Sequence, residues 1–179
     1  MRKVLYILGA LAGLIFIACL VKHQTASRRV SFKDVKVIKH SGDNDKQVRV
    51  VKNGKWGMTD RTGKILGEIE YDSISTFSEG FSVVAKNGKY GYVDEEFNFI
   101  VEPKYDFGNY FVNGFAIVRH NKKDGFINKE GEEIIKPNYY DYISNFDRDG
   151  HAIAESYAEG KKHIIDTNGK IVKDLTVKK

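Results

Sequence analysis

The sequence predicts an all-β protein: tandem β-hairpin and meander repeats, three full units and a truncated fourth, preceded by one N-terminal transmembrane or signal helix. Three observations lead to this fold class. An internal repeat runs through residues 48–175. Asn-Gly and Asp-x-x-Gly turn signals separate its short apolar runs. No stretch after residue 22 keeps a 3.6-residue apolar period over three turns, so sustained helices are not expected there.

Residues 1–22 are interpreted as a membrane anchor or signal segment. Arg2 and Lys3 precede an uncharged run of 18 residues from Val4 to Val21. As a helix this run is about 27 Å long at 1.5 Å per residue. A hydrocarbon core is about 30 Å thick, so the run is a short but adequate span. A cationic start followed by an apolar stretch is also typical of an export signal.

Three arrangements at the membrane remain open. We expect an uncleaved single-pass anchor with the repeats outside the cytoplasm, because the first segment's own signal usually sets orientation. A lipid-anchored form is the second, since Phe16-Ile17-Ala18-Cys19 resembles a lipobox and makes Cys19 a candidate lipid attachment site. The third places the domain in the cytosol, because more cations follow the apolar run than precede it.

Charge is uneven along the chain. Residues 22–64 carry a net charge of +8 and residues 65–179 a net charge of −5. The basic excess therefore lies beside the membrane, where each Lys or Arg near anionic headgroups contributes about 1 kcal/mol. Residues 23–47 are interpreted as a basic juxtamembrane linker with a lead-in strand. An acidic folded body excludes a nucleic-acid partner, whereas the basic stretch makes the membrane surface a partner.

The repeat is visible in four aligned segments, spaced by 34, 34 and 38 residues. They are Lys55-Trp56-Gly57-Met58-Thr59-Asp60, Lys89-Tyr90-Gly91-Tyr92-Val93-Asp94, Lys123-Asp124-Gly125-Phe126-Ile127-Asn128 and Lys161-Lys162-His163-Ile164-Ile165-Asp166. Other positions recur in register with them, among them Tyr71, Tyr105 and Tyr139, and Phe77, Phe111 and Phe146. The fourth unit stops early, as a capping repeat does, and residues 176–179 form a tail.

Each unit is expected to form short antiparallel strands. Asn53-Gly54 and Asn87-Gly88 predict two-residue hairpin turns, in which both residues take positive φ. A second turn is predicted where a side-chain oxygen accepts backbone N–H groups and the third residue on is left-handed. That turn starts at Asp60, Asp94, Asn128 and Asp166. Pro103 and Pro137 are expected to end the third strand, because proline lacks a ladder N–H. One helical turn near Phe77 or Phe111 is the local alternative.

The repeat resembles the WG β-repeats of bacterial proteins. The resemblance rests on Lys55-Trp56-Gly57 with Asp60 and Gly63, on Tyr90-Gly91-Tyr92-Val93-Asp94, and on Pro103-x-Tyr105-Asp106. It covers residues 48 to about 174. Trp-Gly itself occurs once, and Tyr-Gly, Asp-Gly and Lys-His replace it in the later units. The resemblance implies a β-rich repeat fold and supplies no catalytic signature, cofactor or ligand residues.

No catalytic, metal or cofactor site is predicted from the residues. The histidines lack metal-ligand spacing, and the one cysteine lies in the membrane segment. The Asp/Asn residues that recur once per unit behave as turn residues. Trp56, Tyr90 and Tyr92 are interpreted as the shared core between repeats, with an exposed stacking surface as the alternative.

Two functions follow. The favoured hypothesis is a membrane-tethered β-repeat binding or scaffold module, not an enzyme, that presents a surface to a protein or an envelope polymer. The alternative is a diverged cell-envelope hydrolase with a site in the third repeat around His151, Asp149 and Glu155, where two residues are inserted. Electrostatic association of residues 22–64 with lipid is a third hypothesis, and it would weaken as salt rises.

Overall fold

The computed structural model describes residues 28–38 and 47–177. These residues form two compact parts, one ending at Ile69 and the other beginning at Glu70. The predicted N-terminal helix and Cys19 lie outside the described residues. Within the described ranges, no helix has the length and apolar character needed to cross a membrane.

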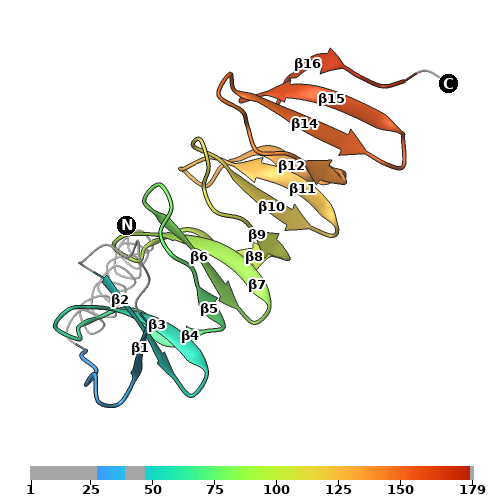
Figure 1. Ribbon diagram of the computed structural model, residues 1–179. Coiled ribbons are helices and arrows are strands. Elements are labelled where there is room, and N and C mark those ends of the chain that lie inside the picture. Colours follow the sequence, from blue (N-terminus) through green and yellow to red (C-terminus); the bar gives the residue numbers. More distant parts are fainter. Residues whose placement is uncertain (1–27, 39–46, 178–179) are drawn as a thin grey trace, which may run out of the picture. The chain divides into compact units, whose positions relative to one another are not determined.

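The described chain is all-β, as predicted, and forms four antiparallel sheets of four strands each (Figure 1). The first sheet has the order β1-β2-β3-β4. Its strands are β1 (Lys36–Ile38), β2 (Gln47–Lys52), β3 (Lys55–Asp60) and β4 (Ile65–Tyr71). The lead-in segment thus contributes a strand to the first sheet, because β1 pairs with β2 through Val37 and Val50.

The other three sheets follow in chain order and repeat this meander. The second sheet consists of β5 (Ser73–Ile74), β6 (Phe81–Lys86), β7 (Lys89–Asp94) and β8 (Phe99–Tyr105). The third consists of β9 (Phe107–Gly108), β10 (Ala116–His120), β11 (Lys123–Ile127) and β12 (Glu133–Tyr140). The fourth consists of β13 (Tyr142–Ile143), β14 (His151–Ser156), β15 (Lys161–Asp166) and β16 (Ile171–Asp174).

Both predicted turn types are confirmed. In the β6–β7 hairpin Asn87 has φ +53° and Gly88 has φ +72°, the backbone that a tight hairpin needs. In the second turn type, the Asp166 Oδ1 accepts the backbone N–H groups of Asn168 and Lys170, both at 2.9 Å. Asp60 and Asn128 accept in the same way from the residues two and four positions on, and Asp94 Oδ1 accepts from the backbone N–H of Asn98, four positions on. Side-chain turn bonds therefore fix the β3–β4 type of connection in every unit.

The predicted ends of the third strands are wrong. β8 continues through Pro103 to Tyr105, and β12 continues through Pro137 to Tyr140. The ladder shifts register there: Tyr92 pairs with Val101, but Tyr90 pairs with Tyr105. The proline therefore sits in a bulge, where its missing N–H costs no ladder bond.

Two further expectations are corrected by the third sheet and by the tight turns. β12 holds one residue more in its bulge, so Tyr140 and not Tyr139 is the counterpart of Tyr105. Tyr140 is buried and precedes Asp141, just as Tyr105 precedes Asp106. Near Phe77 and Phe111 the chain makes a β-turn closed by a bridge, not a helical turn. Glu79-Gly80 and Asn113-Gly114 supply the positive φ angles of those turns.

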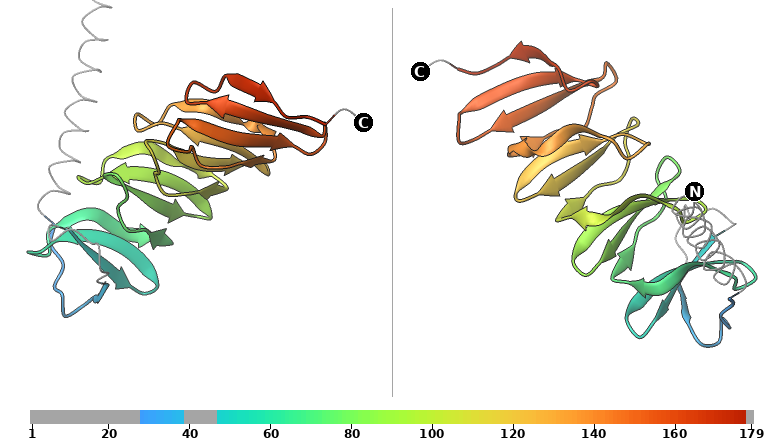
Figure 2. Two further views of the ribbon diagram at one scale, coloured as in Figure 1. Left: turned by 45° about the horizontal axis from the view of Figure 1, so that its top comes forward. Right: turned by 180° about the vertical axis from the view of Figure 1, so that it is seen from behind.

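In the part from Glu70 onward, each sheet packs a face on the next, and the three sheets follow one another in both views of Figure 2. One core cluster joins the second and third sheets around Tyr92, Phe111 and Val118. Another joins the third and fourth sheets around Phe126, Phe146 and Ile165. Burial of apolar side chains between neighbours is the main stabilising term in such an array.

Polar contacts fasten the same sheets together at their connections. Asp106, which links β8 to β9, accepts from Lys89 Nζ of the second sheet and from the backbone N–H of Asn121 in the third. Asp141 repeats this one unit later, with Lys123 Nζ and the backbone N–H of Tyr157. In both units, therefore, an aspartate at a strand connection (Asp106 or Asp141) joins two neighbouring sheets through one lysine and one backbone N–H. We call each of these aspartate contacts a fastener.

Candidate binding site

The slot beside each hairpin turn, defined as the second cross-strand pair from the turn, differs from unit to unit. This slot holds the partners Val51 and Trp56 in the first sheet, and Ala85 and Tyr90 in the second. The same slot holds Arg119 and Asp124 in the third sheet and Glu155 and Lys162 in the fourth. The slot is therefore apolar or aromatic in two sheets and ionic in the other two.

The ionic pair of the third sheet is geometrically strong. Arg119 Nε and Nη2 donate to the two oxygens of Asp124, at 2.6 and 3.1 Å. Asp124 is almost fully buried, and its hydrogen bond to Arg119 raises the pKa of the guanidinium further above its ordinary value. A buried carboxylate needs such a bidentate partner, because burial of an unpaired charge is costly.

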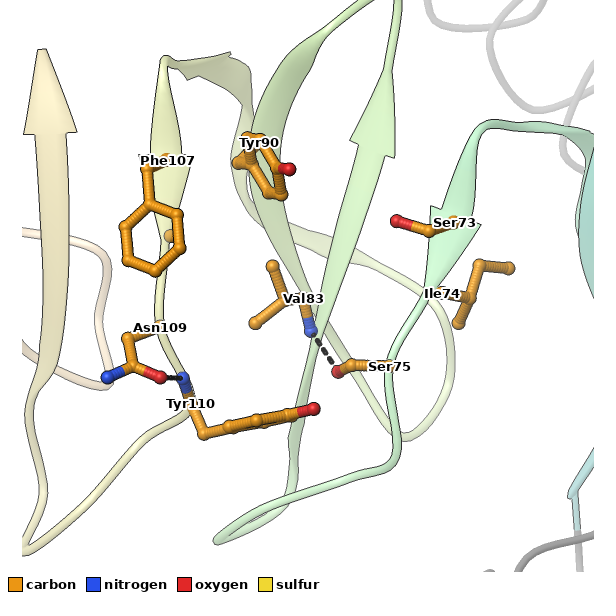
Figure 3. A pocket seen from close by; sticks show the side chains of 9 residues that line it. Ser73, Ile74, Ser75, Val83, Tyr90, Phe107, Asn109 and Tyr110 are labelled. Carbon is orange, nitrogen blue, oxygen red and sulfur yellow. Dashed lines mark hydrogen bonds between the residues drawn. The ribbon is translucent and has the colours of Figure 1, made fainter.

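The second sheet keeps an aromatic slot, and a pocket opens beside it. The pocket has a volume of about 330 Å³ and lies between the second sheet and the segment that begins the third (Figure 3). Its lining residues come from β5 and the segment after it, from β6 and β7, and from β9 and the segment after it. They are Ser73, Ile74, Ser75, Val83, Tyr90, Phe107, Gly108, Asn109 and Tyr110.

Three aromatic rings form part of the pocket wall. The rings of Tyr90 and Phe107 lie 5.9 Å apart between centroids, and Tyr110 extends below them toward Ser75 and Val83 (Figure 3). Phe107 and Tyr110 are 41% and 47% exposed. The rings therefore present apolar faces to solvent inside a concave site, a combination typical of ligand pockets.

Hydrogen bonds within the protein hold the backbone around the pocket. Tyr92, fully buried behind it, donates its hydroxyl to the backbone oxygen of Asn109 at 2.8 Å, and burial raises the pKa of that hydroxyl. Ser75 Oγ accepts from the backbone N–H of Val83 at 2.9 Å. Gly108 makes room for this arrangement, since a Cβ there would lie 2.7 Å from the Tyr92 hydroxyl oxygen. The site is thus formed in advance of any ligand.

The aromatic residues singled out from the sequence divide between the two interpretations. Tyr92 belongs to the core, as predicted. Tyr90 is half-buried and lines the pocket, so it serves both packing and the pocket wall. Sequence reasoning missed Phe107 and Tyr110. The counterparts of Phe107 are Ser73 in the second unit and Tyr142 in the fourth. Those of Tyr110 are Thr76 and Asn145, so departure from the repeat was the signal that could have found Tyr110.

The three residues of the hydrolase alternative do not converge. His151 and Glu155 stand four residues apart on β14, about 13 Å at 3.3 Å per residue. Asp149 lies in the preceding turn, where its backbone N–H donates to Asp147 Oδ1. Glu155 is paired with Lys162 at 2.8 Å.

These polar residues replace apolar and aromatic residues of an earlier sheet. His151 stands where Phe81 stands in the second sheet, and the Glu155–Lys162 pair stands where Ala85 and Tyr90 do. They lie on the face of β14 and β15 opposite to Ala154 and Ile165, which pack on the third sheet. This face of the fourth sheet is therefore more polar than the matching face of the second.

In the described part of the chain, no group of three or more His, Cys, Asp or Glu side chains could hold a metal ion. The candidate lipid attachment site Cys19 lies outside the described residues.

Similarity to solved structures is low. Hsv2 of Kluyveromyces lactis aligns at 13% identity with a TM-score of 0.44, over 80% of this chain and 52% of its own. Virginiamycin B lyase of Staphylococcus aureus aligns at 16% identity with a TM-score of 0.39, over 84% and 58%. The chain thus spans little more than half of these proteins.

Comparison by sequence identifies the family. No curated protein sequence matches the chain. The model of the WG containing repeat matches residues 56–90, 90–123 and 125–156, which is more than half of the chain. Each matched segment runs from the second half of one sheet into the first half of the next, so the first covers β3 to β6. The chain belongs to the family of proteins with the WG containing repeat.

Proposed function

We propose that this protein is a membrane-tethered β-repeat binding module, not an enzyme, which presents a surface of residues 70–177 to a protein or polymer of the cell envelope. Residues 1–22 serve as the single-pass anchor, and the repeats stand outside the cytoplasm. Lipid anchoring through Cys19, or a cytosolic domain, are the alternative topologies that the experiment below separates.

The observation that carries the proposal is an aromatic edge, defined as Phe107, Tyr110 and Tyr142. Phe107 and Tyr142 are the first residues of β9 and β13, and Tyr110 follows β9. All three are more than 40% exposed, at 41%, 47% and 43%. The inter-sheet clusters are complete without them. Exposed aromatic side chains of this kind are typical of interaction surfaces.

The fastened sheets support the same function. Besides the aspartate fasteners, Glu79 accepts from the backbone N–H of Gly114 at 2.9 Å and from Lys129 Nζ at 3.1 Å, which joins the second sheet to the third. Asn113 Nδ2 donates to the backbone oxygen of Phe146 at 2.9 Å, which joins the third segment to the fourth. A rigid array loses little conformational freedom when it binds, and this favours affinity.

Topology is tested first, by protease treatment of intact spheroplasts that express the full chain with a C-terminal tag. Loss of the tag before lysis is the expected result, and protection until lysis would contradict the exported arrangement. Mass spectrometry of the N-terminal peptide of the same protein separates an uncleaved anchor from a lipidated Cys19.

Binding is tested with a photo-crosslinking amino acid placed at Tyr142 in the full chain. Position 96, an exposed glutamate in the β7–β8 turn, is the matched control. A discrete adduct with an envelope component from position 142, absent from position 96, is the expected result. Identical adducts from both positions, or none from position 142, would contradict a binding role for the aromatic edge.

A further inference from the structure

We propose that the pocket between β7 and β9 binds one neutral pyranose residue, with equatorial ring substituents, of an oligosaccharide. The inference rests on the proposed function, because it names the chemistry of the envelope polymer that the module recognises. It concerns the pocket lined by Tyr90, Phe107, Asn109 and Tyr110, together with the serines of the β5 segment.

The aromatic walls match the faces of such a sugar. A pyranose with equatorial substituents carries its hydroxyl groups around the rim and C–H groups on both faces. An apolar face of this kind packs on an aromatic ring, while the rim remains available for hydrogen bonds. Tyr110 and Phe107 offer exposed ring faces, and the 330 Å³ of the pocket lies at the lower end of the range for small-ligand sites.

The polar groups of the pocket have unused hydrogen-bonding capacity. Asn109 Oδ1 accepts from the backbone N–H of Tyr110 at 2.9 Å, and its Nδ2 group points away from Tyr90 and Val83 (Figure 3). The hydroxyl groups of Ser73, Tyr90 and Tyr110 form no hydrogen bond with another described group of the chain. Hydroxyls and amides both donate and accept, which suits the mixed donors and acceptors around a sugar ring.

The lining of the pocket carries no charged side chain, and this favours neutral ligands over charged ones. None of its nine residues is acidic or basic. A charged ligand would lose hydration on entering and find no compensating ion pair, whereas a neutral sugar exchanges water hydrogen bonds for protein ones. The pocket lined by Lys104, His120, Glu133 and Lys136 shows the contrast, because it is dominated by charged groups.

The combination does not recur in the next interval of the array. At the junction of the third and fourth sheets, Tyr142 stands in the place of Phe107, but Asp124 stands in that of Tyr90, Ile143 in that of Gly108 and Asn145 in that of Tyr110. The repeat itself therefore does not require Tyr90, Gly108 or Tyr110, and their chemistry is open to a ligand.

The test uses the full chain in detergent micelles and isothermal titration with three probes: cellotetraose, chitotetraose and the acidic tetragalacturonate. We expect saturable binding of at least one neutral probe and none of the acidic one. Tyr110→Ala should weaken this binding about fivefold, which corresponds to a loss of about 1 kcal/mol for one aromatic contact. Ser73→Ala removes a hydroxyl that points toward Tyr90 in the pocket (Figure 3), and should weaken binding as well.

Tyr157→Ala is the matched control, because Tyr157 is an exposed aromatic residue outside the pocket. It should leave the affinity unchanged, and thermal unfolding checks that every variant folds. Failure of both neutral probes, tighter binding of tetragalacturonate, or binding indifferent to Tyr110→Ala and Ser73→Ala would overturn the proposal. If crosslinking at Tyr142 succeeds while the saccharides fail, the sugar pocket alone is refuted and the binding module stands.

Discussion

The hydroxyl of Tyr140 lies 3.0 Å from Nδ1 of His163, inside the interface between the third and fourth sheets. The two residues are only 8% and 6% exposed. His163 occupies the repeat position that is glycine in the first three units, at Gly57, Gly91 and Gly125. The fourth sheet tolerates a side chain there because β16 ends early and carries no proline bulge over this position.

Replacement of Tyr140 by Phe should therefore destabilise the protein by about 1–3 kcal/mol, since it leaves a ring nitrogen of His163 buried without its partner. Urea unfolding of the full chain measures the loss. Tyr139→Phe is the matched control, because the neighbouring hydroxyl bonds only to the exposed Glu159 and should cost less than about 0.5 kcal/mol. Equal losses in the two variants would contradict a special role for the Tyr140–His163 pair.

The glycine of the aromatic-glycine pair is needed for close backbone approach. A Cβ at Gly91 would lie 2.5 Å from the carbonyl oxygen of Val101 and 2.6 Å from the nitrogen of Pro103. Gly91→Ala should cost several kcal/mol, because backbone atoms of the bulge must move. The same repeat position in the fourth unit, His163, has no proline bulge beside it, so His163→Ala should lower the free energy of unfolding by less than Gly91→Ala does. Thermal unfolding compares the two, and a milder effect at Gly91 would contradict the close-approach explanation.

Periodic features of the sequence predicted most of the fold. Turn residues such as Asn87-Gly88 and Asp166 act through local backbone chemistry, so their sequence pattern determines their conformation. The bulge at Pro103 was mispredicted because a missing N–H ends a strand or enters a bulge equally well. The choice depends on Gly91 leaving space for the bulged backbone. Tyr139 was misassigned because one inserted residue in β12 shifts the side-chain alternation.

The candidate site was less predictable, because several of its residues differ from their counterparts in the other units. Tyr110 occurs where the repeat is broken, since its counterparts are Thr76 and Asn145, and periodicity carries no information at such a position. Gly108 replaces a buried isoleucine, yet only the packing of Tyr92 behind it explains the exchange. Recurrence thus predicted the scaffold, whereas the pocket required the contacts between sheets.

The ionic slot of the third sheet should be exchangeable with the aromatic slot of the second. Arg119→Ala alone leaves Asp124 buried without its cation and should cost about 3–5 kcal/mol. The double variant Arg119→Ala/Asp124→Tyr recreates the Ala85–Tyr90 pair at the same register and should recover most of that loss. A double-mutant cycle by urea unfolding measures the coupling. Additive losses in the two single variants would contradict the exchange.

The Asp106 fastener makes inter-sheet stability depend on pH. The hydrogen bond from Lys89 Nζ, followed by that from the Asn121 N–H, lowers the pKa of Asp106 below its ordinary value of 3.8. A carboxylate whose pKa is lower in the folded state stabilises the fold fully above its unfolded pKa, and this contribution disappears as pH falls through the folded value. Asp106→Asn should therefore be less stable than the wild type at pH 7, and the difference should shrink below about pH 4.

Glu102→Gln, at an exposed carboxylate on the same strand, should show no such difference. Urea unfolding between pH 3 and 7 provides the comparison. A stability gap for Asp106→Asn that stays constant through pH 3 would mean that the fastener acts through shape and not through charge.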